Sequence, residues 1–331
     1  MKKNIITLFV LIFTLLSDIS FAQLFYSENP FAHTYSIVAR DPVTGEMGVA
    51  VQSHWFSVGS IVAWGEAGVG VVATQSFVNP AFGPDGIELM KQGMSADEVL
   101  DKLIGEDEGR DLRQLAVLDV NGNVKAYTGK NCIYGAGHIV GENYSVQANL
   151  MLNDKVWSAM SESFENSTGS LAERMIAALE AGENAGGDIR GKQSACLLIV
   201  RGEATGNLWE DRLIDLRVDD NPEPIEELKR LLKVHRAYEH MNNGDVAVEH
   251  GDMELAMKEY MAAEEMFPDN EEMKYWHAVT LVNNGDLQNA LPIFKEVFTK
   301  NENWKTLTPR LLPTGLLNVN EEQLEKILSV K

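Results

Sequence analysis

The hydrophobic and polar pattern predicts short β-strands interleaved with a few helices between about residues 34 and 219. Apolar, often β-branched runs predict strands at 34–39, 46–52, 58–64, 68–74, 112–120, 124–128, 135–140, 144–147, 194–201 and 213–218. Apolar faces at helical spacing predict helices at 83–92, 95–103, 154–164 and 170–181. Because strands and helices come in separate blocks, the pattern favours an α+β layered fold over an alternating parallel sheet.

Turn and cap residues indicate some of these boundaries. Pro42 and Gly45 lie early and late in a tight turn, where proline fixes φ and glycine accepts a positive φ. Ser95 and Glu98 form a capping-box pattern at the start of the second helix. Asn121-Gly122 predicts a hairpin between the two strands that flank it.

The pattern becomes almost purely helical after Pro222. Three matches share a spacing of 34 residues: Gly251-Asp252 with Gly285-Asp286, Ala256 with Ala290, and Tyr260 with Phe294. This spacing resembles the tetratricopeptide repeat, with a first copy at about 237–270 and a looser second copy at about 271–304. Two copies are fewer than the three usually needed for an independent solenoid, so a pair of generic helical hairpins is the alternative.

The first 22 residues read as a signal peptide. Lys2 and Lys3 precede an apolar run at 5–16, and Ser20-Phe21-Ala22 offers small residues at the two positions that a signal peptidase reads. Cleavage before Gln23 predicts an exported, periplasmic or secreted protein with no membrane span after signal cleavage; an uncleaved anchor is the alternative. We expect a short leader or propeptide at 23–33, a layered domain at 34–224 and a helical domain at 225–331.

The formal net charge of -21 argues against nucleic acid or an anionic membrane surface as a partner. Export permits a disulfide between Cys132 and Cys196, but two cysteines so far apart in sequence do not establish one. We favour a buried free thiol at Cys196. No metal-binding or cofactor-binding motif is present, so no metal and no cofactor are expected.

Eight segments between residues 34 and 224 carry a further signal. They are T-Y-S-I-V-A-R-D-P (34–42), G-V-A-V-Q-S-H (48–54), G-E-A-G-V-G-V-V-A-T-Q (65–75), N-P-A-F-G-P-D-G (79–86), R-Q-L-A-V-L-D (113–119), Y-S-V-Q-A-N-L (144–150), G-G-D-I-R-G-K-Q-S-A (186–195) and L-R-V-D-D-N-P-E-P (216–224). Together they resemble an uncharacterised bacterial family that is described as N-terminal-nucleophile (Ntn) hydrolase-like and catalogued as a domain of unknown function. The resemblance implies a four-layer αββα sandwich of two antiparallel sheets with helices outside.

The resemblance also implies that Thr34 is a catalytic nucleophile. In Ntn hydrolases the first residue of the mature chain attacks the substrate, and its own α-amine accepts the proton. In this sequence, a cut before Gln23 leaves eleven residues ahead of Thr34. An amide nitrogen cannot act as the base, so either a second cut separates His33 from Thr34 or Thr34 is merely a strand residue.

Other candidate site residues have weaker support. Ser53 and His54, at the end of the second strand, are candidates for assisting proton transfer, and Asn79 and Asn149 for stabilising an oxyanion. The candidate substrate-binding residues are Glu66, Gln75, Asp188 and Arg190. His54 as a half-buried structural histidine, the asparagines as turn caps and Glu66 as a turn residue are the alternatives. Arg190 suits a substrate carboxylate, although we favour a structural pair with Asp188.

The sequence therefore predicts an exported Ntn amidohydrolase that acts on a small amide or peptide after cleavage before Thr34. The stretch 46–75 has no Lys or Arg, which argues against the lysine-assisted chemistry of proteasome-type enzymes. The alternative is an inactive Ntn-like binding or scaffolding protein that docks a protein or envelope partner through its helical repeats. A homo-oligomer is also expected.

Overall fold

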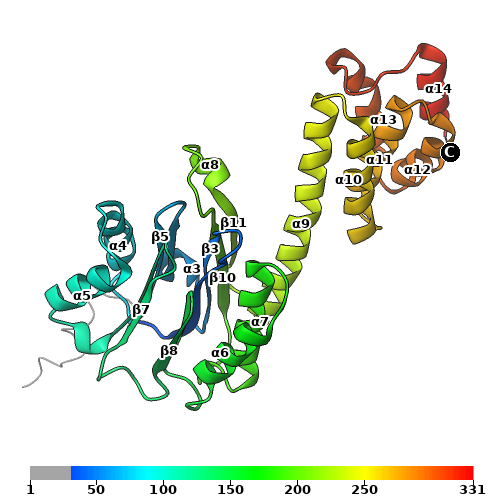
Figure 1. The fold of residues 1–331 in the computed structure, drawn as a ribbon. Helices are drawn as coiled ribbons and strands as arrows, with labels where there is room; N and C mark the ends of the chain where they lie inside the picture. Colours follow the sequence, from blue (N-terminus) through cyan, green and yellow to red (C-terminus); the bar gives the residue numbers. More distant parts are fainter. Residues whose placement is uncertain (1–30, 331) are drawn as a thin grey trace, which may run out of the picture. The chain divides into compact units, whose positions relative to one another are not determined.

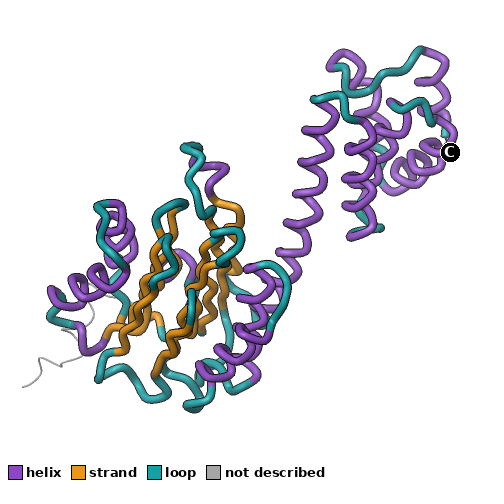
Figure 2. Tube along the Cα trace, viewed as in Figure 1, coloured by secondary structure: helices purple, strands orange, loops and turns teal. Residues whose placement is uncertain are grey.

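The computed structural model describes residues 31–330 and divides the chain into two compact units, one up to Lys229 and one from Arg230 (Figure 1). The first unit contains all of the described strands, and the second is helical (Figure 2). The predicted signal peptide, and the predicted leader up to residue 30, lie outside the described residues. No helix within residues 31–330 has the length and apolar character needed to cross a membrane.

Two antiparallel sheets form the centre of the first unit. In the first sheet the order is β1 (Phe31–Ala32), β5 (Gly70–Phe77), β6 (Arg113–Asp119) and β7 (Val124–Thr128), with β4 (Ala63–Glu66) also paired to β5. In the second sheet the order is β11 (Arg212–Val218), β10 (Ser194–Val200), β3 (Met47–Ser53), β2 (Thr34–Arg40), β9 (Tyr144–Ala148) and β8 (Gly137–Gly141). The chain passes from the first sheet to the second at His33.

Helices cover the outer faces of both sheets, so the unit has four layers (Figure 1). Apolar side chains of α4 (Phe82–Lys91) and α5 (Ala96–Glu106) pack on the outer face of the first sheet, against Val72, Leu115 and Val117. The second sheet is covered by α6 (Val156–Asn166) and α7 (Leu171–Asn184). The predicted capping box of Ser95 and Glu98 is present at the start of α5. The predicted mixed α+β class is confirmed.

One predicted strand, 58–64, is wrong over its first half. The chain instead forms a short helix, α3 (Gly59–Val62), and pairs with β5 only from Ala63 onward. Tertiary contacts outweigh the β-branched composition here: Val58 N donates to Ser194 Oγ at 3.1 Å. A side chain at Gly59 would come within 2.5 Å of Cys196 Cβ, so the backbone lies directly on β10. Further short helices are η1 (Arg110–Leu112) and α8 (Leu208–Asp211).

The space between the sheets has two chemically different ends. We call one the apolar end; it consists of Val38, Met47, Val49, Val51, Val71, Ala73, Ala116, Leu118, Cys196 and Leu198. We call the other the polar end; it consists of Thr34, Ser36, Ser53, Gln75, Gln114, Gln147, Asn149 and Ser194, all with 0% exposure. Both cysteines are free thiols, and burial raises the pKa of Cys196 to about 12.

The helical unit extends from Arg230, within α9 (Pro224–Glu249), through α10 (Met253–Met266), α11 (Glu271–Asn283), α12 (Leu287–Lys300), α13 (Asn303–Leu307) and η2 (Thr308–Thr314) to α14 (Glu321–Ser329). Residues 34 positions apart have matching roles. Asp252 and Asp286 cap α10 and α12 with their side chains. Gly251 and Gly285, just before them, have φ of 75° and 84°, a conformation that favours glycine.

The interior of the helical unit shows the same correspondence. Ala256 and Ala290 are both fully buried, and Tyr260 and Phe294 occupy equivalent buried positions. A side chain at Gly244 would come within 2.7 Å of the Tyr260 ring, so the helices approach most closely at a small residue. Residues 34 positions apart therefore have the same burial in α10 and α12.

Candidate functional site

Strand register places three hydroxyl side chains in one row across the second sheet. Thr34 on β2 lies opposite Ser53 on β3, and Ser53 lies opposite Ser194 on β10. Directly opposite residues share a face of the sheet, and here that face is the one turned toward the first sheet. The row begins at Thr34, the first residue of β2 and the predicted nucleophile.

The carbonyl of His33, immediately before Thr34, accepts two hydrogen bonds from side chains. Ser53 Oγ donates to it at 2.5 Å, and Arg190 Nη2 donates to it at 2.8 Å. One donor is a hydroxyl and the other carries a positive charge. Donors of this kind stabilise negative charge on a carbonyl oxygen. The two donors therefore polarise the bond between His33 and Thr34.

Arg190 is held in place by Asp188, whose side chain is completely buried. Two hydrogen bonds join the guanidinium to the carboxylate, Nη2 to Oδ2 at 2.6 Å and Nε to Oδ1 at 3.0 Å. Asp188 Oδ2 also accepts from the backbone nitrogen of His54 at 3.2 Å. The favoured structural pair of Asp188 and Arg190 is present, and it directs the guanidinium toward the backbone of His33.

A network of buried amides underlies the start of β2. Gln75 Nε2 donates to Gln114 Oε1 at 2.7 Å and to the Thr34 carbonyl at 3.3 Å. Ser36 Oγ donates to Gln75 Oε1 at 2.6 Å and accepts from Gln147 Nε2 at 2.7 Å. Because each amide has defined donors and acceptors, the network fixes the orientation of every member. These bonds connect the two sheets directly beneath Thr34.

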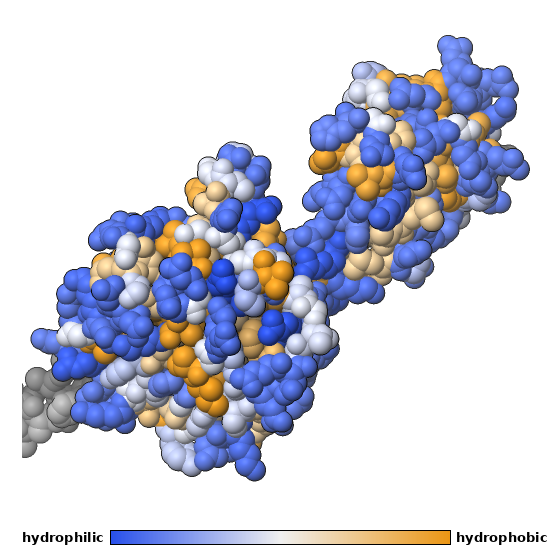
Figure 3. Space-filling model, viewed as in Figure 1, coloured by the Kyte–Doolittle hydropathy of each residue, from blue (hydrophilic) through white to orange (hydrophobic). Residues whose placement is uncertain are grey.

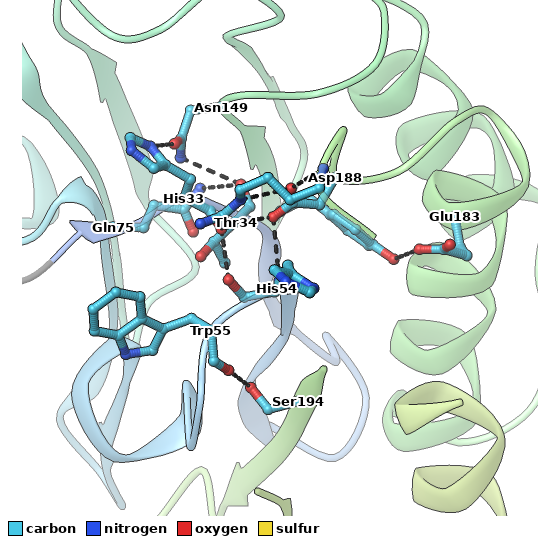
Figure 4. Close-up of polar contacts among 12 residues, drawn as sticks. His33, Thr34, His54, Trp55, Gln75, Asn149, Glu183, Asp188 and Ser194 are labelled. Carbon is cyan, nitrogen blue, oxygen red and sulfur yellow. Dashed lines mark hydrogen bonds and ion pairs between the residues drawn. The ribbon is translucent and has the colours of Figure 1, made fainter. Parts of the chain in front are cut away.

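Asn149 belongs to this network and to the surroundings of His33 (Figure 4). Its Nδ2 donates to Gln114 Oε1 at 2.9 Å and to the Thr34 carbonyl at 3.3 Å, so Oδ1 remains as an acceptor. Oδ1 lies 2.9 Å from His33 Nδ1. The next residue, Leu150, has φ of 59°, a strained conformation that costs about 1–3 kcal/mol and is common beside functional sites.

His33 is buried, with only 3% of the residue exposed. It makes an edge-to-face contact with Phe77, with ring centroids 5.6 Å apart. Because Asn149 Oδ1 can only accept, Nδ1 of the neutral ring carries the proton. Burial is the main cause that lowers the pKa of His33; the positive charge of Arg190 acts in the same direction, and the bond to Asn149 and the charge of Asp188 oppose it.

The other predicted site residues lie apart from this group or at its edge. Glu66 ends β4, opposite Gly70 at the far end of β5, and it pairs with Lys91 at 2.7 Å. Asn79 Oδ1 accepts from Ala81 N at 3.2 Å, which is a local turn before α4. His54 is exposed, rather than half-buried as in the structural alternative, and only its backbone nitrogen is bonded to Asp188 (Figure 4).

Four participating residues were missed from the sequence: His33, Ser36, Gln114 and Gln147. Only Gln114 carried a clear signal: it is a polar residue at an inward position of β6, and the next inward positions, Ala116 and Leu118, are apolar. Among residues 31–330, no group of three His, Cys, Asp or Glu side chains is placed to hold a metal ion.

Two antiparallel sheets, outer helices and a buried polar site at the start of β2 together define a layered α+β domain. Residues 34–228 match a family of unknown function, DUF1028. The match covers more than half of the chain, which therefore belongs to this family. It begins at Thr34, the first residue of the site's central strand.

A solved structure is similar to the same part of the chain. It is the crystal structure of protein SPO2555 from Silicibacter pomeroyi, which is also described by the DUF1028 family. The two are 29% identical with a TM-score of 0.56, over 61% of this chain and 85% of the other. No curated protein matches the chain significantly.

Proposed function

We propose that this protein is an exported N-terminal-nucleophile amidohydrolase that becomes active when the bond between His33 and Thr34 is broken. The observation that carries the proposal is the pair of hydrogen bonds from Ser53 and Arg190 to the His33 carbonyl, at 2.5 and 2.8 Å. The four-layer arrangement and the family match that begins at Thr34 support it. An Ntn-type αββα sandwich is the fold that such an enzyme requires.

The proposed activation step uses the groups around this carbonyl. The Thr34 hydroxyl adds to the carbonyl carbon of His33, and Ser53 and Arg190 stabilise the negative charge on the oxygen. The carbon–nitrogen bond then breaks, and the nitrogen takes the hydroxyl proton to become the free amine of Thr34. Water hydrolyses the resulting ester and leaves the carboxylate of His33 and the hydroxyl of Thr34.

Thr34 then has both groups needed for turnover. A free α-amine has an ordinary pKa near 8 and can accept the proton of the adjacent hydroxyl, directly or through water. The bonds from Gln75 and Asn149 to the Thr34 carbonyl hold the residue in position. The substrate is an amide or a small peptide, and its carbonyl takes the place of the His33 carbonyl.

Intact mass and N-terminal sequencing of the purified protein test the proposal. We expect a chain beginning at Thr34 in the wild type and in the conservative variant Thr34→Ser, because both keep a hydroxyl. Thr34→Ala retains its leader because it has no nucleophile. A stable wild-type species beginning at Gln23, or the same cut in Thr34→Ala, would remove the mechanism.

A binding function is the second candidate, and the helical unit favours it. Its two matched helical hairpins are tetratricopeptide-like, and one surface has a cavity of about 690 Å³ lined in part by Met257, Met261 and Ala262. Methionine side chains adapt to varied apolar partners. In Figure 3 polar side chains cover most of the visible face of both units, with smaller apolar patches among them.

The binding candidate predicts a partner that depends on this cavity. Met261→Glu is expected to abolish partner capture while amide hydrolysis continues, because the substitution puts a charge into the apolar lining. Lys258→Gln, on the same helix and cavity, is the matched control, because it also makes the net charge more negative by one unit. Equal partner capture by wild type and Met261→Glu would exclude the cavity as the docking site.

A further inference from the structure

The segment before Thr34 is held against the first sheet as a short added strand. Phe31 lies opposite Phe77 and Ala32 lies opposite Ser76, at the end of β5. His33 then leaves this sheet, and Thr34 begins β2 of the other sheet. Pairing of an extended backbone with a sheet edge is also a common way for proteins to bind peptides.

The side chain of His33 fills a site built from both sheets. Phe77 from β5 contacts the ring edge-to-face, and Asn149, just after β9, presents Oδ1 to Nδ1. The amide nitrogen of Asn149 is already bonded to Gln114 and Thr34, so this site offers an acceptor. It therefore suits a short planar side chain with an N–H donor two bonds beyond Cβ.

Histidine and asparagine have such a side chain. Asn Nδ2 and His Nδ1 are separated from the backbone by the same number of bonds. Aspartate would direct a carboxylate at Asn149 Oδ1, and leucine would leave this buried oxygen without its donor, which is costly. The backbone pairing, the side-chain site and the two donors on the carbonyl all lie along one continuous segment, residues 31–33.

Resting on the proposed function, we infer that residues 31–33 are an attached stand-in for the substrate. The mature enzyme hydrolyses an extended peptide on the carboxyl side of a histidine or asparagine. The peptide pairs with Ser76 and Phe77, and its carbonyl meets Ser53 and Arg190. Thr34 Oγ bonds to the carbonyl carbon, the amine product leaves with the transferred proton, and water releases the peptide acid.

Four fluorogenic peptides test the inference on the processed wild-type protein. They are acetyl-Phe-Ala-His, acetyl-Phe-Ala-Asn, acetyl-Phe-Ala-Asp and acetyl-Phe-Ala-Leu, each joined to aminomethylcoumarin. We expect kcat/KM for the His and Asn peptides to be at least about tenfold above Leu, with Asp the slowest, because only His and Asn donate to Asn149. The free acid acetyl-Phe-Ala-His is expected to inhibit competitively, about tenfold better than the Leu acid.

A variant of the aromatic contact separates the two preferred residues. Phe77→Leu is expected to slow the His peptide about fivefold more than the Asn peptide, because only the imidazole makes the edge-to-face contact. Equal slowing of both peptides would contradict the placement of the side chain in this site.

The outcomes separate this inference from the function on which it rests. A chain beginning at Thr34 that hydrolyses all four peptides equally, or none of them, overturns the inference and leaves activation at Thr34 intact. A chain that keeps its leader overturns both, and intact mass identifies that case before any peptide is added.

Discussion

The apolar and polar ends of the space between the sheets are built from the same strands but depend on different interactions. On β6, Leu118 and Ala116 belong to the apolar end, and Gln114, two residues further back on the same face, belongs to the polar end. The apolar end is held by close packing, which depends on volume. The polar end is held by directed hydrogen bonds, which depend on the identity of each atom.

This comparison shows how a polar site can be built inside a sandwich of otherwise apolar side chains. Burying a polar group is unfavourable unless it is hydrogen-bonded, so an isolated glutamine at this depth would destabilise the fold. Gln75, Gln114 and Asn149 bond one another instead, and the Gln147 amide bonds Ser36 and Ser145. Their mutual bonds provide a rigid support for the start of β2, where the proposed chemistry takes place.

The largest expected effect comes from placing methionine at matched positions of the two ends. Gln114→Met keeps a similar shape but leaves several buried donors and acceptors unpaired, so we expect a loss of about 4 kcal/mol in the free energy of unfolding. Leu118→Met should cost less than about 1.5 kcal/mol because the volume is nearly conserved. Urea unfolding in the Thr34→Ala background measures both in the same covalent form. Equal costs would contradict the distinction between the ends.

A smaller effect distinguishes hydroxyl groups within the polar end. Ser53→Ala removes a donor from the His33 carbonyl, so we expect cleavage before Thr34 to slow about 10²-fold or more. Ser194→Ala is the matched control, because its hydroxyl bonds the Trp55 carbonyl instead. The time course of leader loss, followed by mass, measures both variants. Equal slowing by both variants would mean that the serine hydroxyls stabilise the fold and that the bond from Ser53 to the His33 carbonyl does not promote cleavage.

The smallest expected effect is a pH dependence of the free energy of unfolding, caused by His33 beside the polar end. Burial lowers the pKa of His33 below its ordinary value near 6.5, so the unfolded chain binds more protons in that range. The stability of the unprocessed Thr34→Ala protein should therefore fall as pH decreases below about 6.5 and through the folded pKa. His33→Gln should reduce this slope, as measured by urea unfolding between pH 5 and 7.5.

The apolar end serves as the reference for that measurement. Its titratable member is Cys196, and a pKa raised to about 12 keeps this thiol protonated throughout the pH range of the experiment. An unchanged slope in His33→Gln would assign the dependence to groups other than His33.

The order of strands and helices was largely predictable because it depends on local patterns. Ser95 and Glu98 identified the start of α5, and Asn121-Gly122 lies between β6 and β7 as expected. The segment 58–64 was not predictable, because its shape depends on Cys196 and Ser194, more than 130 residues away. Local preference cannot show such contacts.

The site was predictable only in part, for the same reason. The sequence predicted the Thr34 hydroxyl as the reactive group, whereas the structure adds the two side-chain donors on the carbonyl of His33. Arg190 reaches that carbonyl across 157 residues, and Asn149 meets His33 across 116. The ion pair of Asp188 and Arg190 was predictable because the two residues are neighbours. Glu66, which the glycines around it made a candidate, ends β4 and lies opposite the other end of β5.

The crossing at His33 also has a consequence for folding. In the intact chain, this residue connects β1 of one sheet directly to β2 of the other, so the leader and the domain fold as one continuous chain. Breaking the bond would remove this covalent link permanently. The precursor could refold reversibly after denaturation, whereas the mature chain would have to refold without the link, and its lifetime would be set by its rate of unfolding.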